Sequence, residues 1–316
     1  MARVGVIGDA NVDLLLWTDG HPPVGGEALA ERSLVCLGGS ALTTAVGLAR
    51  LGHEPALVTS VGADDWGERI RRDLAANGVS TRLLRTRDDT GTQLNVSIVS
   101  PGGERTMYTY GGASRLGNPE GVAALGAVDA LHVSGYALLA EGQRAAVAAA
   151  RALRSSGVPL SVDVPVAVVD REPERLWDLV CGADIVSVGG PELRRLVARF
   201  AGTPAGDAVA DLAAPLHAAG VAAVAVKQGA GGAWLSRPGG LTRQEPQPAE
   251  VVDATGAGDA FMAGLLAGIL DRRGDGETLL LADTMGALTV GHAGAGTGLA
   301  SAEAIAAAVA RRRPGY

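Results

Sequence analysis

The sequence has few of the residues that mark several large classes of protein. Its 316 residues include two cysteines, Cys36 and Cys181, too few for a disulfide scaffold and without the C-x-x-C spacing of a zinc site. Acidic residues exceed basic ones, and the net charge of -7 argues against a general nucleic-acid-binding surface. The longest apolar run, 261–270, is too short to cross a bilayer, and no signal-peptide core precedes Asp9. We therefore expect a soluble intracellular protein, with the cytoplasm as its default compartment.

Three motifs of nucleotide and metal chemistry are also missing. No G-x-x-x-x-G-K-[ST] occurs, which excludes a P-loop NTPase. The first predicted strand is followed by G-D-A-N at 8–11, where a dinucleotide oxidoreductase would have G-x-G-x-x-G. The five histidines show no metal-ligand spacing. Any chemistry has to come from other residues.

Short apolar runs alternate with amphipathic stretches along most of the chain. Strands are predicted at 3–7, 128–133, 160–164, 184–188 and 221–226, and helices at 42–51, 68–76, 143–154, 191–200 and 207–219. Such an alternation predicts a mostly parallel sheet that helices cover on both faces. Three other segments, 28–36, 92–99 and 106–110, alternate polar and apolar residues, as strands with one solvated face do. Pro101-Gly102-Gly103 predicts a hairpin-type turn between the last two.

The strongest functional signal is the run D-A-T-G-A-G-D at 253–259. Gly256 and Gly258 can adopt backbone angles closed to other residues, and the apolar helix follows directly. The N–H groups of 256–258 would then point outward at a helix N-terminus, which attracts phosphate. Asp259 beside that phosphate would accept a proton from an attacking hydroxyl. The alternative is a capped helix in which Asp259 only complements the helix dipole.

This run closely resembles the D-T-x-G-A-G-D signature of the ribokinase-like, PfkB-type carbohydrate kinases. Other elements of that family follow its order: G-D-A-N-V-D at 8–13, G-G-S-A at 38–41, V-G-A-D-D-W-G at 61–67, G-V at 78–79 and V-K-Q-G-A-G-G-A at 226–233. The resemblance covers essentially the whole chain. It implies an α/β fold, with a three-layer α/β/α domain around a mostly parallel central sheet and a small β-sheet lid. A single domain would span 1–316, with lid strands from about 14–36 and 92–111.

The resemblance implies an ATP-dependent kinase that transfers the γ-phosphoryl group to a sugar hydroxyl. Asp259 falls on the catalytic base of the family, and the backbone of Gly256, Ala257 and Gly258 falls on its anion hole. The positions that bind the acceptor are Asn11, Asp13, Gly38, Gly39 and Thr43. An Asn-x-Asp pair at a strand end directs both side chains to one face. Without the resemblance, both residues would be interpreted as ordinary turn formers.

On the nucleotide side, the resemblance implies roles for Lys227, Gly229 and Gly232, with magnesium as the metal. Glu192 falls on an acid that acts on magnesium through water, while Gly189 replaces the Asn of the family's N-x-x-E. The alternative for Glu192 is an acid in the first turn of a helix after Pro191. Asp253, with nearby backbone carbonyls, is a candidate ligand for a monovalent cation such as potassium.

Two departures from the family bear on the acceptor. Ser40 and Thr43 replace the Lys and Asn common in ribose kinases, and Gly111 follows Tyr110 where kinases of sugar acids often have Arg. We therefore predict a neutral monosaccharide, because hydroxyl-pairing groups dominate and aromatic residues make up only 3% of the chain. The aromatic residues that could stack on a base are Trp17, Trp66, Tyr108 and Tyr110.

Two alternatives to a sugar kinase stay open: a nucleoside kinase of the same family, and a non-catalytic sugar-sensing protein on the same fold. The expected partners are ATP and the small acceptor, with neither nucleic acid nor membrane among them. A homodimer that forms through the lid is a further expectation.

Overall fold

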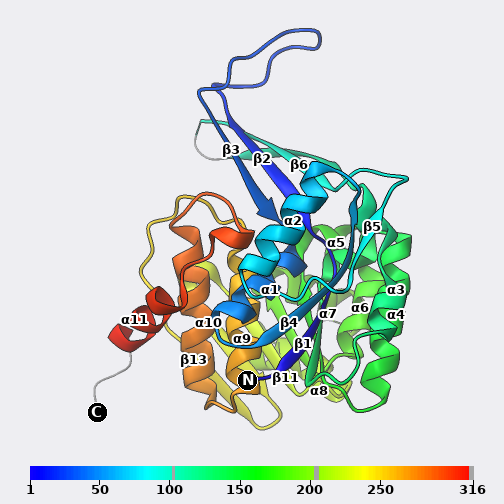
Figure 1. Ribbon diagram of the computed structural model, residues 1–316. Helices are drawn as coiled ribbons and strands as arrows, with labels where there is room; N and C mark the ends of the chain where they lie inside the picture. The colour runs from blue at the N-terminus through cyan, green and yellow to red at the C-terminus, as the bar shows by residue number, and fades with distance from the viewer. Residues whose placement is uncertain (102–103, 203–205, 313–316) are drawn as a thin grey trace.

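The computed structural model describes residues 1–101, 104–202 and 206–312, and its centre is a large twisted sheet (Figure 1). The strand order is β13-β12-β11-β10-β9-β8-β1-β4-β5. These strands are β1 (Arg3–Ile7), β4 (Glu54–Gly62), β5 (Leu84–Arg87), β8 (Ala130–Val133), β9 (Leu160–Val164), β10 (Ile185–Gly189), β11 (Ala223–Lys227), β12 (Ala233–Arg237) and β13 (Gly240–Gln244). From β11 to β5 all neighbours are parallel, while β12 and β13 extend one edge in antiparallel fashion. The predicted mostly parallel sheet is confirmed.

Helices cover both faces of this sheet, as predicted (Figure 1). One layer contains α1 (Ser40–Arg50), α2 (Asp65–Ala76), α9 (Ala257–Leu270), α10 (Asp275–Val290) and α11 (Ala302–Arg312). The other contains α3 (Pro119–Ala123), α4 (Glu141–Ser155), α5 (Val166–Arg171), α6 (Pro173–Cys181), α7 (Gly190–Phe200) and α8 (Val209–Ala218). Because strand side chains alternate, Val6 of β1 packs into the first core and Ile7 into the second. Within the described residues, no helix is long and apolar enough to span a membrane.

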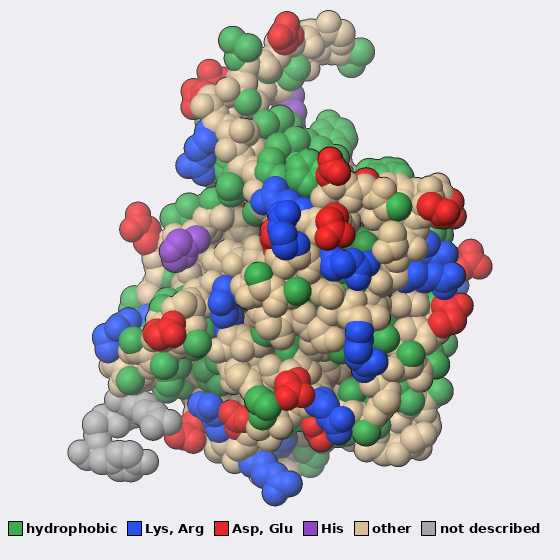
Figure 2. Space-filling view, viewed as in Figure 1, with side chains coloured by type: hydrophobic (Ala, Val, Ile, Leu, Met, Phe, Trp, Pro, Cys, Tyr) green, Lys and Arg blue, Asp and Glu red, His purple; other side chains and the backbone are tan. Residues whose placement is uncertain are grey.

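A smaller four-stranded sheet forms the lid above one end of the large sheet (Figure 1). Its strands are β2 (Asn11–Trp17), β3 (Arg32–Gly38), β6 (Leu94–Val99) and β7 (Arg105–Tyr110), in the order β3-β2-β6-β7. The central pair is parallel and the outer pairs are antiparallel. The space-filling view shows the lid and the long 18–31 connection standing clear of the main body (Figure 2).

Two details of the lid differ from the sequence prediction. Asn11 and Asp13 do not end the first strand; they begin β2, because β1 stops at Ile7 and the chain then pairs with β3 and β6 in the other sheet. The strand predicted at 28–36 is shifted to β3, since only the residues that face β2 form ladder bonds. Two residues of the predicted turn, Gly102 and Gly103, lie outside the described part of the chain.

The close approach of α1 to α9 positions the site. A Cβ at Gly47 would lie 2.6 Å from the Cβ of Ala263, so only glycine lets the two helices pack this tightly. Thr44 of α1 also donates a hydrogen bond to the Asp259 carbonyl at 3.4 Å. The N-termini of α1 and α9 are therefore brought together beside the carboxyl ends of the central strands.

Candidate active site

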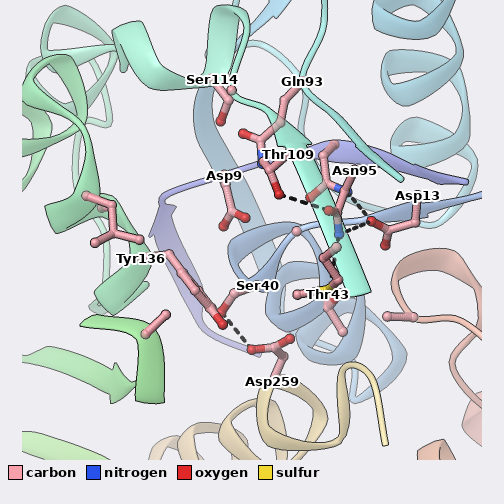
Figure 3. A pocket seen from close by; sticks show the side chains of 18 of the residues that line it. Asp9, Asp13, Ser40, Thr43, Gln93, Asn95, Thr109, Ser114, Tyr136 and Asp259 are labelled. Carbon is pink, nitrogen blue, oxygen red and sulfur yellow. Dashed lines mark hydrogen bonds between the residues drawn. The ribbon is translucent and has the colours of Figure 1, made fainter. Parts of the chain in front are cut away.

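A pocket of about 740 Å³ lies between the lid and the carboxyl ends of the central strands (Figure 3). The chain order reverses beside β1, which has β4 on one side and β8 on the other. Ligands of open α/β sheets bind in the crevice at such a reversal. Asp9 follows β1, Tyr136 follows β8, and Asp259 comes from the first turn of α9; all three line the pocket.

The turn before α9 has the left-handed glycine that the sequence predicted at Gly256, whereas Gly258 lies inside the helix and does not have the special backbone conformation predicted for it. Gly256 precedes the helix in the left-handed region, with φ of 76°. A Cβ there would also lie 2.6 Å from the Cβ of Ala295, so both conformation and space favour glycine. The Ala257 N–H donates to the carbonyl of Ala254 at 3.3 Å. Gly258 and Asp259 follow within the first turn of the helix, where N–H groups have no partner from the helix itself.

Ser40 joins Asp259 to a second carboxylate that the sequence prediction missed. Its hydroxyl donates to Asp259 Oδ1 at 2.6 Å (Figure 3). The same hydroxyl lies 3.3 Å from Asp163 Oδ2. The other oxygen of Asp163 accepts the Gly135 N–H at 2.8 Å. No sequence signal marked Asp163, because its segment was predicted only as a buried strand of the sheet. Ser40 appeared only as a departure from the family pattern, and the fold makes it the bridge between α1 and α9.

The surroundings of Asp259 raise its pKa to about 7. Burial is the largest cause, and the nearby carboxylates of Asp163 and Asp9 act in the same direction. The Ser40 hydrogen bond and the Lys227 ammonium oppose this rise, because both stabilise the ionised carboxylate. A carboxylate that titrates near neutral pH can take up a proton during a reaction and lose it afterwards.

At the opposite side of the pocket from Tyr136, polar side chains surround Asp13 (Figure 3). Asn11 and Asn95 donate to Asp13 Oδ1 at 2.6 and 3.1 Å. Thr109 of β7 donates to the Asn95 side-chain carbonyl at 2.9 Å. Burial raises the pKa of Asp13 to about 6, although the two amide donors oppose the shift. The predicted pair Asn11 and Asp13 therefore does lie together, and Asn95 and Thr109 complete a network that no linear motif indicated.

The other residues predicted to bind the acceptor substrate, Gly38, Gly39 and Thr43, lie next to this network or in the pocket wall. A Cβ at Gly38 would overlap the Asp13 carboxylate, so glycine leaves the space that the carboxylate occupies. Gly39 has φ of 101° and packs against the Asp9 carbonyl. Thr43 is fully buried at the pocket wall, where its hydroxyl accepts the Gly296 N–H at 3.1 Å.

Asp9 is a pocket residue that the sequence analysis left without a role. In the close-up view it lies above Ser40 and Asp259, across the pocket from Asp13 (Figure 3). Burial raises its pKa above the ordinary aspartate value, although the Ala41 N–H donates to its Oδ1 at 3.3 Å. Three carboxylates thus converge on one cavity, which suits donors such as sugar hydroxyls.

The predicted nucleotide residues lie beside this pocket, and none is among its described lining residues. Lys227 ends β11 next to α9, where a Cβ at Gly258 would lie 3.3 Å from its ammonium nitrogen. Burial lowers the pKa of Lys227, while Asp163, Asp259 and Glu192 oppose the shift. Gly229 begins a single 3-10 turn after β11 and Gly232 follows that turn, with φ of 53° and 83°.

Glu192 lies in the first turn of α7, and its carboxylate folds back over Gly189. Within the described residues it forms neither a hydrogen bond nor an ion pair, although Lys227 is close enough to interact electrostatically. Magnesium prefers carboxylate, water and phosphate oxygens. A carboxylate without a partner next to Lys227 fits that preference, with water between the acid and the ion.

Asp253 is already surrounded by donors. Its Oδ1 accepts from the Thr255 N–H at 2.9 Å, the Thr255 hydroxyl at 2.6 Å and Arg105 at 2.8 Å. Its Oδ2 accepts the Gly294 N–H at 2.9 Å. A monovalent cation at this carboxylate stays a prediction, and it would require these donors to rearrange.

Comparisons with known proteins give one consistent result along the chain. A family model described as pfkB family carbohydrate kinase matches residues 1–302. An ATP-dependent ribose-1-phosphate kinase from Halopiger xanaduensis is 31% identical, with 99% of each chain covered. A fructokinase from Klebsiella pneumoniae is 32% identical, with 94% of this chain and 96% of that protein covered. The solved ribokinase of Arabidopsis thaliana, complexed with ribose and ATP, has a TM-score of 0.78 at 23% identity over 98% of each chain.

Proposed function

The chain belongs to the pfkB family of carbohydrate kinases, and from this premise we propose that Asp259 is the base for sugar phosphorylation in the pocket it lines. The observation that carries this proposal is the placement of one carboxylate. Asp259 has a pKa of about 7, lies in the first turn of α9, where N–H groups have no partner from the helix itself, and lines the same cavity as Asn11 and Asp13.

In this mechanism, Asp13 and Asn11 hold hydroxyls of the sugar and orient another hydroxyl toward Asp259. Asp259 takes the proton of that hydroxyl as its oxygen bonds to the γ-phosphorus of ATP. The bond from phosphorus to the bridging oxygen breaks, and ADP leaves. The backbone N–H groups of 256–258 stabilise the charge on the transferred oxygens. Ser40 keeps the Asp259 carboxylate oriented and favours its ionised form.

We assign Lys227, Gly229 and Gly232 to the nucleotide, because Lys227 lies beside Gly258 in the first turn of α9 and the two glycines follow it at the end of β11. Glu192 would hold magnesium through water. Bound magnesium neutralises charge on the phosphates. The Lys227 ammonium, which lies beside Gly258 in the first turn of α9, would add a positive charge next to the phosphates.

A sugar acceptor is better supported than a nucleoside. Of the described residues that line the pocket, only Tyr136 is aromatic. Trp17 is instead covered by Arg32, at 3.8 Å from its ring, and Trp66 faces Arg69. Tyr108 and Tyr110 of the lid are exposed outside the pocket lining. A base would therefore find little surface on which to stack.

We also propose that the chain acts as one catalytic domain and pairs with a second copy through its lid. All six residues of the edge strand β7 are exposed, and Met107 and Tyr108 present apolar surface there. An exposed edge strand of this kind favours pairing with another chain. The cytoplasm stays the predicted compartment. Light scattering on the purified protein tests the dimer, and a monomer at high concentration would contradict it.

The test of the proposed function is ADP release with ATP and magnesium over a panel of sugars, sugar phosphates, sugar acids and nucleosides. We expect at least one sugar to stimulate ADP release far above background. If none of the acceptors stimulates ADP release, although binding of a sugar can be measured, the result would favour the sensing protein instead.

A further inference from the structure

Two arginines with no partner among the described residues line the active-site pocket. Arg115 lies in the 3-10 helix η1 (Ala113–Leu116), and Arg171 is the last residue of α5. We call these two residues the arginine wall. Within the described residues, neither guanidinium forms a hydrogen bond, an ion pair or a ring contact.

The lack of partners for Arg171 is not caused by a shortage of acids nearby. Its neighbour Asp170 pairs with Arg195, and Glu172 pairs with Arg144 and Arg175. The acids next to it are thus paired with arginines from other elements, and Arg171 is left to face the cavity.

The place of Arg115 depends on Gly111. A Cβ at Gly111 would overlap the side chain of Arg115, which therefore lies over the glycine and borders the pocket. In the sequence, no arginine follows Tyr110 directly. In the fold, the arginine four residues after Gly111 lies over that position.

The elements that carry the two arginines are linked by packing. The helix η1 packs on α4, α4 packs on η2 (Gly135–Leu139), and η2 packs on α5. Tyr136 of η2, the element that packs on α5, lies opposite the Asp13 network in the close-up view (Figure 3). Apart from the place of the transferred phosphoryl group, the carboxylates of Asp9, Asp13 and Asp259 disfavour an anion in the cavity, so an anionic group of the acceptor would bind at the arginine wall.

From this arrangement we propose that the acceptor already carries a phosphate ester, which Arg115 and Arg171 bind while another hydroxyl of the same sugar faces Asp259. Guanidinium groups match phosphate oxygens with paired donors. A phosphate ester carries a charge of about -1.5 to -2 at pH 7, which two unpaired arginines balance, whereas a carboxylate carries one negative charge. The inference rests on the proposed kinase function and departs from the neutral acceptor that the sequence predicted.

The reaction adds a second phosphate and leaves the first in place. The new bond joins the free hydroxyl oxygen to the γ-phosphorus, the bond to the bridging oxygen of ATP breaks, and the proton passes to Asp259. The products are ADP and a sugar bisphosphate. No further reactant is needed.

The test compares matched acceptors under identical ATP and magnesium. We would measure kcat/KM for ribose, ribose 1-phosphate, ribose 5-phosphate, fructose, fructose 1-phosphate, fructose 6-phosphate and gluconate. At least one phosphorylated sugar should exceed its neutral parent by about 100-fold or more. A neutral sugar or gluconate as the best substrate would overturn the inference while leaving the kinase function intact.

Variants then identify the residues. Arg115→Gln and Arg171→Gln should each lower the ratio of kcat/KM for the phosphorylated sugar to that for its neutral parent by about 10- to 100-fold. Arg311→Gln, an exposed arginine of α11 away from the pocket, is the control and should leave the ratio unchanged. A rise in KM for ATP with an unchanged ratio would assign the arginines to the nucleotide and refute the proposal.

Binding measured without ATP separates the two hypotheses. Calorimetry should show that the wild-type protein binds the phosphorylated sugar and that either arginine variant binds it at least about 10-fold more weakly. Binding without any ADP release would mean that the kinase function fails and the anion site stands. Equal binding by the wild type and both folded variants would mean that the site fails.

Discussion

Arg105 in lid strand β7 donates a hydrogen bond to Asp253 Oδ1 at 2.8 Å, across a separation of 148 residues. Asp253 begins the run that leads into Gly256, so this ion pair connects the lid directly to the proposed anion hole. The Asp253 side chain is only 8% exposed. Although burial alone would raise its pKa, hydrogen bonds from Thr255 and Gly294 outweigh that effect and hold the pKa below the usual value.

Removing this connection should loosen the lid. In Arg105→Gln, we expect faster amide exchange across 92–110 and a KM for the acceptor raised by about 2- to 10-fold, the range for loss of one net hydrogen bond. Hydrogen exchange with mass spectrometry, with and without a saturating acceptor, measures the change. In the wild type, acceptor binding should slow exchange in the same segment, and equal exchange in both states would contradict a mobile lid.

The proposed base predicts a clear loss of rate. Asp259→Asn preserves the size of the side chain and removes its ability to take a proton, so kcat should fall by about 10²- to 10⁴-fold with little change in KM. Asp283→Asn is a matched control, because burial also raises the pKa of Asp283, to about 6, although this residue bonds to Gln247 outside the pocket. A near-normal kcat in the Asp259 variant would rule out the assigned base.

The pH dependence should report the same group. Since Asp259 must be ionised to act as a base and its pKa is about 7, kcat/KM should fall as the pH drops below about 7. The Ser40 hydrogen bond lowers this pKa, so Ser40→Ala should move the acidic limb of the profile to higher pH. A limb that stays in place would show that Ser40 does not control the ionisation of Asp259.

The sugar network predicts an effect on binding instead of on rate. Asp13→Ala removes the acceptor of the Asn11 and Asn95 hydrogen bonds, and we expect it to raise acceptor KM by about 10-fold or more through loss of charge-assisted bonds. The KM for ATP should remain close to that of the wild type. Steady-state kinetics with each substrate varied in turn distinguishes this result from a general loss of structure, which would change both constants.

The pH dependence of thermal stability should also depend on Asp259. A carboxyl whose folded pKa is raised contributes stability that is present below its unfolded pKa and is lost as the pH rises through the folded value, here about 7. The Tm of Asp259→Asn minus the Tm of the wild type should therefore increase by about 2–5 °C as the pH rises from 4 to 8. Comparing the two proteins cancels the opposing contribution of His132, whose pKa burial lowers. A constant difference in Tm would show that the pKa of Asp259 is not raised by folding.

Much of the fold could be predicted from local patterns. The strands β1 and β9 occupy the predicted ranges, because a short, continuously apolar run between helical stretches leaves few other structures. The edge strands β12 and β13 and the start of β2 could not be located in this way. Their boundaries depend on which strand they pair with, and pairing is a property of the assembled sheet.

The sequence by itself determined the glycine run that forms the turn before α9 and the placement of Asp259 in its first turn. Those features are local, since backbone conformation and helix position follow from neighbouring residues. Only the tertiary structure decided that Ser40 bridges Asp259 and Asp163, and that Arg115 and Arg171 face the same cavity. These groups are far apart along the chain, and packing of α1 on α9 and of η2 on α5 is what brings them to one pocket. The chemistry of the reaction is therefore encoded locally, whereas the choice of acceptor depends on the fold.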